Sequence, residues 1–236
     1  MALYLIGLGL DKRGISLHGK KILKSAGIKK IYLENYTVEF PYTKKELEKE
    51  LKIKIISADR EFVESEKLVD EAKKEEVVLL VYGSPLSATT HISLINACNE
   101  KRIKFHVLHS GSVFDAVAES GLSLYKFGKT ASLPKWQKNF EPKSFIEIIK
   151  DNQKIGAHTL LLIDIGLVFN DCKNQLIESG LKEKIIVCSR LGIRSKFYYG
   201  ELDKIPSEKI KTPYCLIILG KLDNYEMENL KEMNLR

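Results

Sequence analysis

Short apolar runs alternate with amphipathic stretches through the first half of the chain. The runs have strand length and end at glycine or polar residues, and they lie at 3–8, 31–33, 77–81 and 105–108. Three of the amphipathic stretches between them begin at helix-capping residues, Ser16, Thr43 and Asp59. A further helix is predicted with Thr89 or Thr90 near its cap, and Gly111-Ser112 opens a short one. Thr43 forms a capping box with Glu46. Strands separated by helices of this length predict a mostly parallel sheet that is covered on both faces.

The second half has a different pattern. Helices are predicted at 142–154 and 168–179, and strands at 159–163, 185–189, 196–200 and 214–219. The last three strands follow one another with little room for helices, which predicts an antiparallel or mixed sheet. The pattern changes near Gly121 to Gly128. The sequence therefore predicts two α/β domains, residues 1–120 and 121–236.

Composition and charge exclude several classes of protein. The chain has 236 residues, of which 44% are hydrophobic and 29% are charged, as in globular proteins. The apolar start lacks a preceding basic segment, and the apolar stretch 159–168 is broken by Asp164, so neither a signal peptide nor a membrane span is predicted. The net charge of +7 is spread without a basic run, so it does not choose between nucleic acid, an acidic partner and a lysine-rich surface.

Cysteine usage favours a reducing compartment. The four cysteines form no Cys-x-x-Cys pair and none stands at zinc-finger spacing from a histidine, so no metal site is predicted. Cys188 and Cys215 lie in apolar runs, where we expect small buried side chains. The chain is expected to be cytoplasmic.

The candidate site lies in the loops that follow the strands. Ligands of open parallel sheets bind beyond the carboxyl ends of strands, and four glycine-containing loops qualify, at 7–11, 83–90, 110–113 and 164–166. Gly7 and Gly9 are followed by Lys12 where a dinucleotide fingerprint needs a third small residue, which disfavours NAD, although Glu34 stands where an acidic ribose ligand would. No phosphate-binding loop, His-Glu-x-x-His pair or Gly-x-Ser-x-Gly elbow is present.

A site of glycines, small polar residues and apolar residues is able to hold an adenosine through backbone hydrogen bonds and packing. Methyl transfer from a sulfonium suits such a site, because the cofactor carries the hard chemistry and the protein only aligns the acceptor. The residue types are compatible with methyl transfer, but they do not distinguish it from other functions.

Five ordered segments make the chain resemble the diphthine synthases, which have the tetrapyrrole methylase fold. They are Tyr4 to Leu10, Pro85 to His91, Tyr125 to Lys129, His158 to Leu161 and Gly220 to Leu222. The resemblance implies two α/β domains, the first with a mostly parallel sheet and the second with a mixed sheet. It also implies S-adenosyl-L-methionine in a cleft between the domains, usually in a homodimer. The implied reaction methylates the amino group of a modified histidine on translation elongation factor 2, in diphthamide biosynthesis, with neither a membrane nor a nucleic acid as partner.

The resemblance further implies cofactor contacts, position by position: Leu10, Ser84, Ser87, Ser112, Val113, Ile163, Leu191 and Tyr214. The family normally has Gly-Asp-Pro where this chain has Gly83-Ser84-Pro85. A serine keeps a hydrogen-bonding oxygen but lacks the charge that would attract a sulfonium. We therefore expect this difference to change the affinity for the cofactor more than the fold.

No catalytic residue is fixed by the sequence, and His91 and Asp164 are the two candidates. His91 either takes part in the reaction or fixes the loop at a helix start, and Asp164 either bonds to nearby backbone or faces the acceptor amine. Trp136 either anchors its loop or contacts the elongation factor. Three alternative functions stay open at this point: a tetrapyrrole or ribosomal RNA methyltransferase of the same fold, a cofactor-binding module without turnover, and a nicotinamide oxidoreductase.

Overall fold

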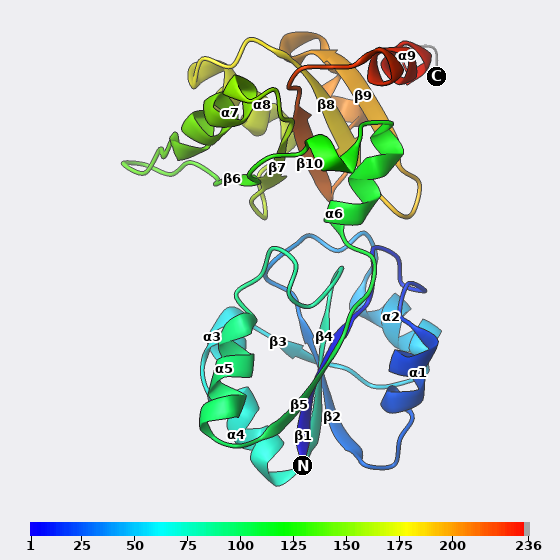
Figure 1. Ribbon diagram of the computed structural model, residues 1–236. Coiled ribbons are helices and arrows are strands. Elements are labelled where there is room, and N and C mark those ends of the chain that lie inside the picture. Colours follow the sequence, from blue (N-terminus) through cyan, green and yellow to red (C-terminus); the bar gives the residue numbers. More distant parts are fainter. Residues whose placement is uncertain (234–236) are drawn as a thin grey trace. The chain divides into compact units, whose positions relative to one another are not determined.

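Two compact units make up the chain. The computed structural model describes residues 1–233. By their internal contacts, the first unit is Met1–Phe114 and the second begins at Asp115. Each unit contains one five-stranded sheet (Figure 1). The boundary predicted from the sequence follows Ser120, a short distance further along the chain.

The sheet of the first unit is parallel throughout, which confirms the predicted mostly parallel arrangement. Its strands are β1 (Ala2–Gly7), β2 (Ile28–Glu34), β3 (Ile56–Ala58), β4 (Glu76–Val81) and β5 (Lys104–Leu108). They lie in the order β3-β2-β4-β1-β5. The strands β4, β1 and β5 are therefore neighbours, and their carboxyl ends lie together at one edge of the sheet.

Helices cover both faces of this sheet, with α1 and α2 on one face and α3, α4 and α5 on the other (Figure 1). The helices of this unit are α1 (Leu17–Leu23), α2 (Lys44–Leu51), α3 (Arg60–Glu64), α4 (Lys67–Lys74), α5 (Ile92–Glu100) and the start of α6 (Val113–Ala116). Successive β4 residues alternate between two clusters: Val77 and Leu79 pack with α4, and Val78 and Leu80 with α2. This burial on both faces explains the continuous apolar run.

Three of the predicted helix caps are confirmed, and one predicted helix is divided. The N-cap of α5 is His91, next to the predicted Thr89 and Thr90. Ser16, Thr43 and Asp59 each accept a hydrogen bond from a backbone N–H in the first turn, and Thr43 has its full capping box. The pattern after Asp59 predicted a single helix. Ser65 instead takes an extended conformation, with φ −82° and ψ 164°, and separates α3 from α4.

The sheet of the second unit is mixed, as predicted. Its strands are β6 (Ala131–Leu133), β7 (Thr159–Ile163), β8 (Lys184–Ser189), β9 (Lys196–Glu201) and β10 (Tyr214–Ile218). The order is β6-β7-β10-β8-β9, with β6 and β7 parallel and the other pairs antiparallel. The strand β10 is central, so its five residues are all buried.

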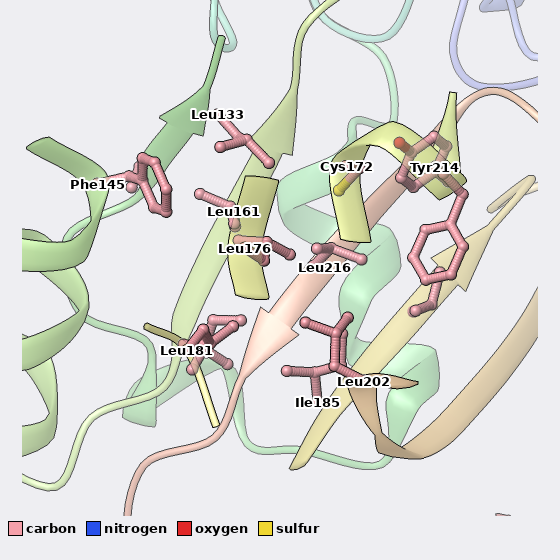
Figure 2. Packing of buried hydrophobic residues seen from close by; sticks show 14 of the residues in the cluster. Leu133, Phe145, Leu161, Cys172, Leu176, Leu181, Ile185, Leu202, Tyr214 and Leu216 are labelled. Atoms are coloured by element: carbon pink, nitrogen blue, oxygen red, sulfur yellow. The ribbon is translucent and has the colours of Figure 1, made fainter. Parts of the chain in front are cut away.

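One apolar cluster joins this sheet to two helices. The helical elements of the unit are α7 (Ser144–Lys154), α8 (Phe169–Glu178), α9 (Asn224–Met233), and the 3-10 turns η1 (Val117–Ser120), η2 (Leu124–Lys126), η3 (Leu202–Lys204) and η4 (Ser207–Lys209). Phe145 from α7 and Leu176 from α8 pack on Leu161 and Leu216 of the sheet (Figure 2). This cluster forms the core of the second unit.

All four cysteines are buried free thiols, as expected for Cys188 and Cys215. Those two lie opposite each other on β8 and β10. Burial raises the pKa of Cys98, Cys188 and, to about 12, Cys172. Across residues 1–233, no helix combines the length and apolar character that crossing a membrane requires.

Candidate functional site

Three loops of the first unit meet at the carboxyl edge of β4, β1 and β5. Gly7 at the end of β1 lies opposite Val81 at the end of β4, and Ile6 lies opposite Leu108 at the end of β5. The loops that follow are those predicted at 7–11, 83–90 and 110–113. The register of three adjacent strands therefore places these distant segments side by side.

Glycines let two of these loops touch through their backbones. Gly9 and Gly83 exchange two N–H···O bonds, each 3.0 Å long, and both have positive φ, 68° and 72°. A Cβ atom on Gly7 would lie 2.6 Å from the Gly83 carbonyl oxygen. No side chain fits at this approach, so the close contact requires glycine.

The structure brings the five predicted cofactor positions of this unit to the same edge. Ser84 Oγ lies 3.1 Å from His109 Nδ1, and the Leu10 carbonyl accepts a hydrogen bond of 3.0 Å from Tyr82. Ser87 N–H donates to the Ser84 carbonyl at 3.0 Å. Ser112 is buried and Val113 starts α6. The sequence did not predict the pairing of Ser84 with His109, because no motif links the two residues.

The groups at this edge fit a neutral nucleoside. They are hydroxyls and main-chain atoms, and a Cβ added at Gly111 would meet nothing within 4 Å, so open space adjoins the third loop. A Cβ on Gly83 would lie 3.8 Å from Ser112 Cα, which shows that the second and third loops also adjoin. S-adenosylmethionine could be held here by hydroxyl groups, backbone groups and packing, as the sequence suggested.

His91 is a buried residue that holds the second loop. Its side chain is 1% exposed. Its Nδ1 lies 2.9 Å from the Pro85 carbonyl, which can only accept, so Nδ1 carries a proton and donates. The peptide carbonyl of Pro85 is thereby fixed within the loop that contains Ser84 and Ser87. This geometry corresponds to a helix-start residue that fixes the loop.

Glu34 completes that arrangement from the end of β2. Its Oε2 lies 3.2 Å from His91 Nε2, its side chain is fully buried, and Thr37 Oγ1 donates to its other oxygen. Within the described residues neither Oε2 nor Nε2 forms a hydrogen bond, so the two atoms face each other as a possible ion pair. Because its carboxylate faces His91 and accepts from Thr37, Glu34 is not available to bind the ribose hydroxyls of a nicotinamide cofactor.

The other three predicted contacts lie together at one edge of the second sheet. Ile163 ends β7, Tyr214 starts the antiparallel β10, and Leu191 follows β8, whose Ser189 lies opposite Tyr214. Tyr214 donates its hydroxyl proton to the Leu167 carbonyl at 2.8 Å. Its side chain and that of Leu191 are mostly buried, so they would offer a ligand small apolar surfaces.

Asp164 and Trp136 both bond to nearby groups of their own unit. The two carboxylate oxygens of Asp164 accept from the Lys135 and Ile165 N–H groups, at 3.1 and 3.0 Å. Trp136 donates from Nε1 to the Pro142 carbonyl at 3.3 Å, and Lys143 lies over its ring. Each residue therefore supports its loop.

A second buried histidine–glutamate pair organises the far end of β7. His158 Nε2 lies 3.1 Å from Glu226 Oε1, and His158 Nδ1 accepts from the Gly220 N–H at 2.9 Å. Lys126 forms an ion pair with the other Glu226 oxygen. Burial lowers the pKa of His158 and opposes ionisation of Glu226. Hydrogen bonds from Lys126 and two backbone N–H groups outweigh that burial and lower the Glu226 pKa to about 2. The sequence did not predict a role for Glu226, because no local sequence pattern links it to His158.

Comparison with known proteins gives one consistent result. Residues 2–206 match the family model of the Tetrapyrrole (Corrin/Porphyrin) Methylases. The chain is 37% identical over 250 residues to the diphthine synthase of Methanococcus vannielii, covering 97% of each chain. It is 42% identical over 165 residues to the diphthine methyl ester synthase of Schizosaccharomyces pombe, covering 69% of this chain and 58% of that protein. A crystal structure of diphthine synthase aligns with a TM-score of 0.90 and 28% identity, over 99% of this chain and 96% of the other.

The pairing of Glu34 with His91 predicts strong energetic coupling. His91→Ala leaves a buried carboxylate without its partner and should cost about 3–5 kcal/mol of unfolding free energy. The double variant with Glu34→Ala should cost at least about 1 kcal/mol less than the sum of the single variants. The four unfolding free energies of this double-mutant cycle are measured by urea unfolding, monitored by far-ultraviolet circular dichroism. Combining His91→Ala with Glu61→Ala, at an exposed site, should be additive; additivity for the Glu34 pair as well would disprove the coupling.

Glu226 and His158 predict acid sensitivity of the second unit. The folded pKa of Glu226 is below its ordinary 4.5, so its stabilisation is complete above that pH and disappears as the pH falls toward 2. His158, with its lowered pKa, adds a loss that begins below pH 6.5. Unfolding monitored by the fluorescence of Trp136, the single tryptophan, reports on this unit.

In Glu226→Gln the loss of stability between pH 4.5 and 2 should shrink by on the order of 3 kcal/mol. Glu228→Gln, on the exposed side of α9, serves as the control and should retain the wild-type curve. Parallel curves for Glu226→Gln and the wild type would contradict the assignment.

Proposed function

Because this chain belongs to the tetrapyrrole methylase family and, within it, to the diphthine synthases, we propose that it methylates the modified histidine of translation elongation factor 2. The observation that carries the proposal is similarity to a diphthine synthase over 97% of both chains. The loop edge of the first unit supports it, since its hydroxyl and backbone groups suit a nucleoside. S-adenosylmethionine is the methyl donor in this proposal.

We propose that Leu10, Ser84, Ser87, Ser112 and Val113 contact this cofactor, and that Ile163, Leu191 and Tyr214 do so as well. The first group offers hydroxyls and main-chain atoms at one edge of a parallel sheet. Ser84 supplies a hydroxyl group and no charge, so cofactor recognition at this position would rest on hydrogen bonding and shape. The two compact units would then correspond to the two domains expected from the sequence.

The bound cofactor supplies a methyl group on a sulfonium, and transfer to a neutral amine breaks the carbon–sulfur bond, forms a carbon–nitrogen bond and leaves the electron pair on sulfur. The protein must hold the acceptor in line with that methyl group. His91 donates to the Pro85 carbonyl, and Asp164 accepts from two backbone groups. Since both candidates are engaged in this way, water takes the acceptor proton in our proposal.

The acceptor is proposed to be the amino group, with a carboxylate as the second candidate. The whole-length relative from Methanococcus vannielii is named a diphthine synthase. The relative from Schizosaccharomyces pombe, which is 42% identical over a shorter stretch, is named a diphthine methyl ester synthase. Esterification would attach a methyl group to a carboxylate oxygen and would need no proton acceptor.

The protein is further proposed to act as a cytoplasmic homodimer. Four buried, unpaired thiols suit a reducing compartment. Homodimers are usual among the proteins that the sequence resembles, and light scattering of the purified chain measures its mass directly.

Methyl transfer is tested with labelled S-adenosylmethionine and elongation factor 2 that carries the unmethylated precursor. We expect label on the modified histidine, stable to mild base, because amine methylation resists hydrolysis and a methyl ester does not. Mass spectrometry of that peptide counts the added methyl groups. No transfer at saturating cofactor would disprove the function, and base-labile label would move the acceptor to the carboxylate. Tetrapyrrole and ribosomal RNA acceptors in the same assay test the other methylase functions.

The location of the cofactor is tested by filling the open space at Gly111. Gly111 does not have positive φ and a Cβ there meets nothing within 4 Å, so Gly111→Phe should fold normally. The ring would occupy space beside the loops and should raise the Kd for S-adenosylmethionine at least tenfold, or about 1.4 kcal/mol of binding free energy. Calorimetry measures this Kd. Gly200→Phe on β9 has the same open surroundings and should bind normally. Equal affinities for both variants would exclude the proposed edge.

A further inference from the structure

The second and third loops of the first unit approach each other at the end of β1. The sheet order places β1 between β4 and β5, so the ends of β4 and β5 are about 10 Å apart, twice the spacing of neighbouring strands. Gly7 ends β1 between them. A Cβ atom on Gly7 would lie 3.0 Å from Ser110 Cβ and 3.1 Å from Pro85 Cδ. Both loops therefore lie against Gly7, close to each other.

One pair of side chains connects these two loops directly. His109 is the first residue after β5, and its Nδ1 lies 3.1 Å from Oγ of Ser84, in the loop after β4. Because β1 separates β4 from β5, the pair joins two segments whose strands are not neighbours in the sheet. The contact therefore depends on the conformation of both loops and not on strand pairing.

This contact completes a closed set of links among the three loops. The backbones of Gly9 and Gly83 join the first loop to the second. Ser110 Oγ donates to the Gly14 carbonyl at 2.9 Å, which joins the third loop to the segment that follows the first. Of these three links, the one made by His109 is the link that engages the side chain of a proposed cofactor contact.

The orientation of the Ser84 hydroxyl is set by this histidine. The Ser84 side chain is 6% exposed, and within residues 1–233 its Oγ forms no other hydrogen bond. A hydroxyl can donate one hydrogen bond and accept two, so the bond to His109 leaves further positions for a ligand. Without the imidazole the hydroxyl would rotate about its Cβ–Oγ bond, and a ligand would have to order it on binding.

The exposure of His109 separates this role from a role in folding. The ring of His109 is exposed, and truncation of an exposed side chain usually changes stability only slightly. Ser84 is buried, and a Cβ atom on the preceding Gly83 would lie 3.8 Å from Ser112 Cα, in the third loop. Loss of the His109 ring would therefore act mainly on Ser84 and on the junction of the two loops.

We propose that His109 is a positioning residue for the cofactor, which holds the Ser84 hydroxyl in the orientation that S-adenosylmethionine requires for binding. The inference rests on the proposed function, which places Ser84 in contact with the cofactor. His109 is not among the contacts that the resemblance implies. In this role it acts through Ser84 and needs no contact with the transferred methyl group.

The test measures the Kd of the whole chain for S-adenosylhomocysteine by calorimetry, without an acceptor. His109→Ala should raise this Kd about tenfold, because one hydrogen bond that orders the site is lost. His109→Asn should stay within about twofold of the wild type, because the asparagine amide reaches the position of the imidazole Nδ1. The amide of His109→Gln lies one bond further from the backbone, near the position of Nε2, so this variant should bind as weakly as His109→Ala.

A second substitution tests whether the effect passes through the serine hydroxyl. Ser84→Ala should also raise the Kd, and adding His109→Ala to it should raise the Kd no further, because the two side chains act as one unit. His106→Ala is the matched control and should bind like the wild type. It removes an exposed histidine of the same strand, whose ring stacks on Tyr4 with centroids 4.9 Å apart. The His109 variants should unfold at the wild-type urea concentration, which excludes loss of the fold as the cause.

The outcomes separate this inference from the proposed function. An unchanged Kd in His109→Ala, or additive effects of the two substitutions, would overturn the inference and leave the cofactor site in place. Recovery by His109→Gln instead of His109→Asn would overturn it too, because a different ring atom would then matter. No binding by the wild type would overturn the cofactor site and this inference together. Binding that depends on His109, without methyl transfer to the factor, would count against the proposed function alone.

Discussion

The close approach of Gly9 and Gly83 is the contact on which the first unit's site depends. Two loops from adjacent parallel strands exchange backbone hydrogen bonds there, and the absence of a Cβ on Gly7 leaves room for the Gly83 carbonyl. The glycines are thus required for the contact between the two loops, whether or not a ligand is bound. Once the loops are joined, Ser84 lies beside the third loop and pairs with His109.

Each unit uses a buried histidine and glutamate to fix a loop, with different proton arrangements. His91 donates from Nδ1 to a carbonyl, and its Nε2 lies 3.2 Å from Glu34 Oε2. His158 accepts at Nδ1 from a backbone N–H, so its single proton lies on Nε2, toward Glu226. The first pair supports the loops of the proposed cofactor contacts and the second supports the far end of β7. In both cases the imidazole is a structural crosslink between segments distant in sequence.

Local pattern predicted the features that depend on neighbours in sequence. The strand at 77–81, the capping box of Thr43 and the mixed second sheet all follow from periodicity, capping chemistry or spacing. The strands β3 and β6 were missed because each has three residues and no apolar run. The partners of His91 and His158 were missed for another reason: such contacts depend on strand order, which no local pattern encodes. The contact residues of the cofactor stay predictions, since they come from resemblance.

The reactivity of the four buried thiols can report local unfolding of each unit. Cys98 lies in the first unit and the other three lie in the second. Since an alkylating reagent must reach the sulfur atom, a buried thiol reacts only when its surroundings separate. The rate at which each cysteine acquires a mass tag therefore measures local unfolding of the unit that contains it. Natural residues thus allow the stabilities of the two halves to be compared without any added label site.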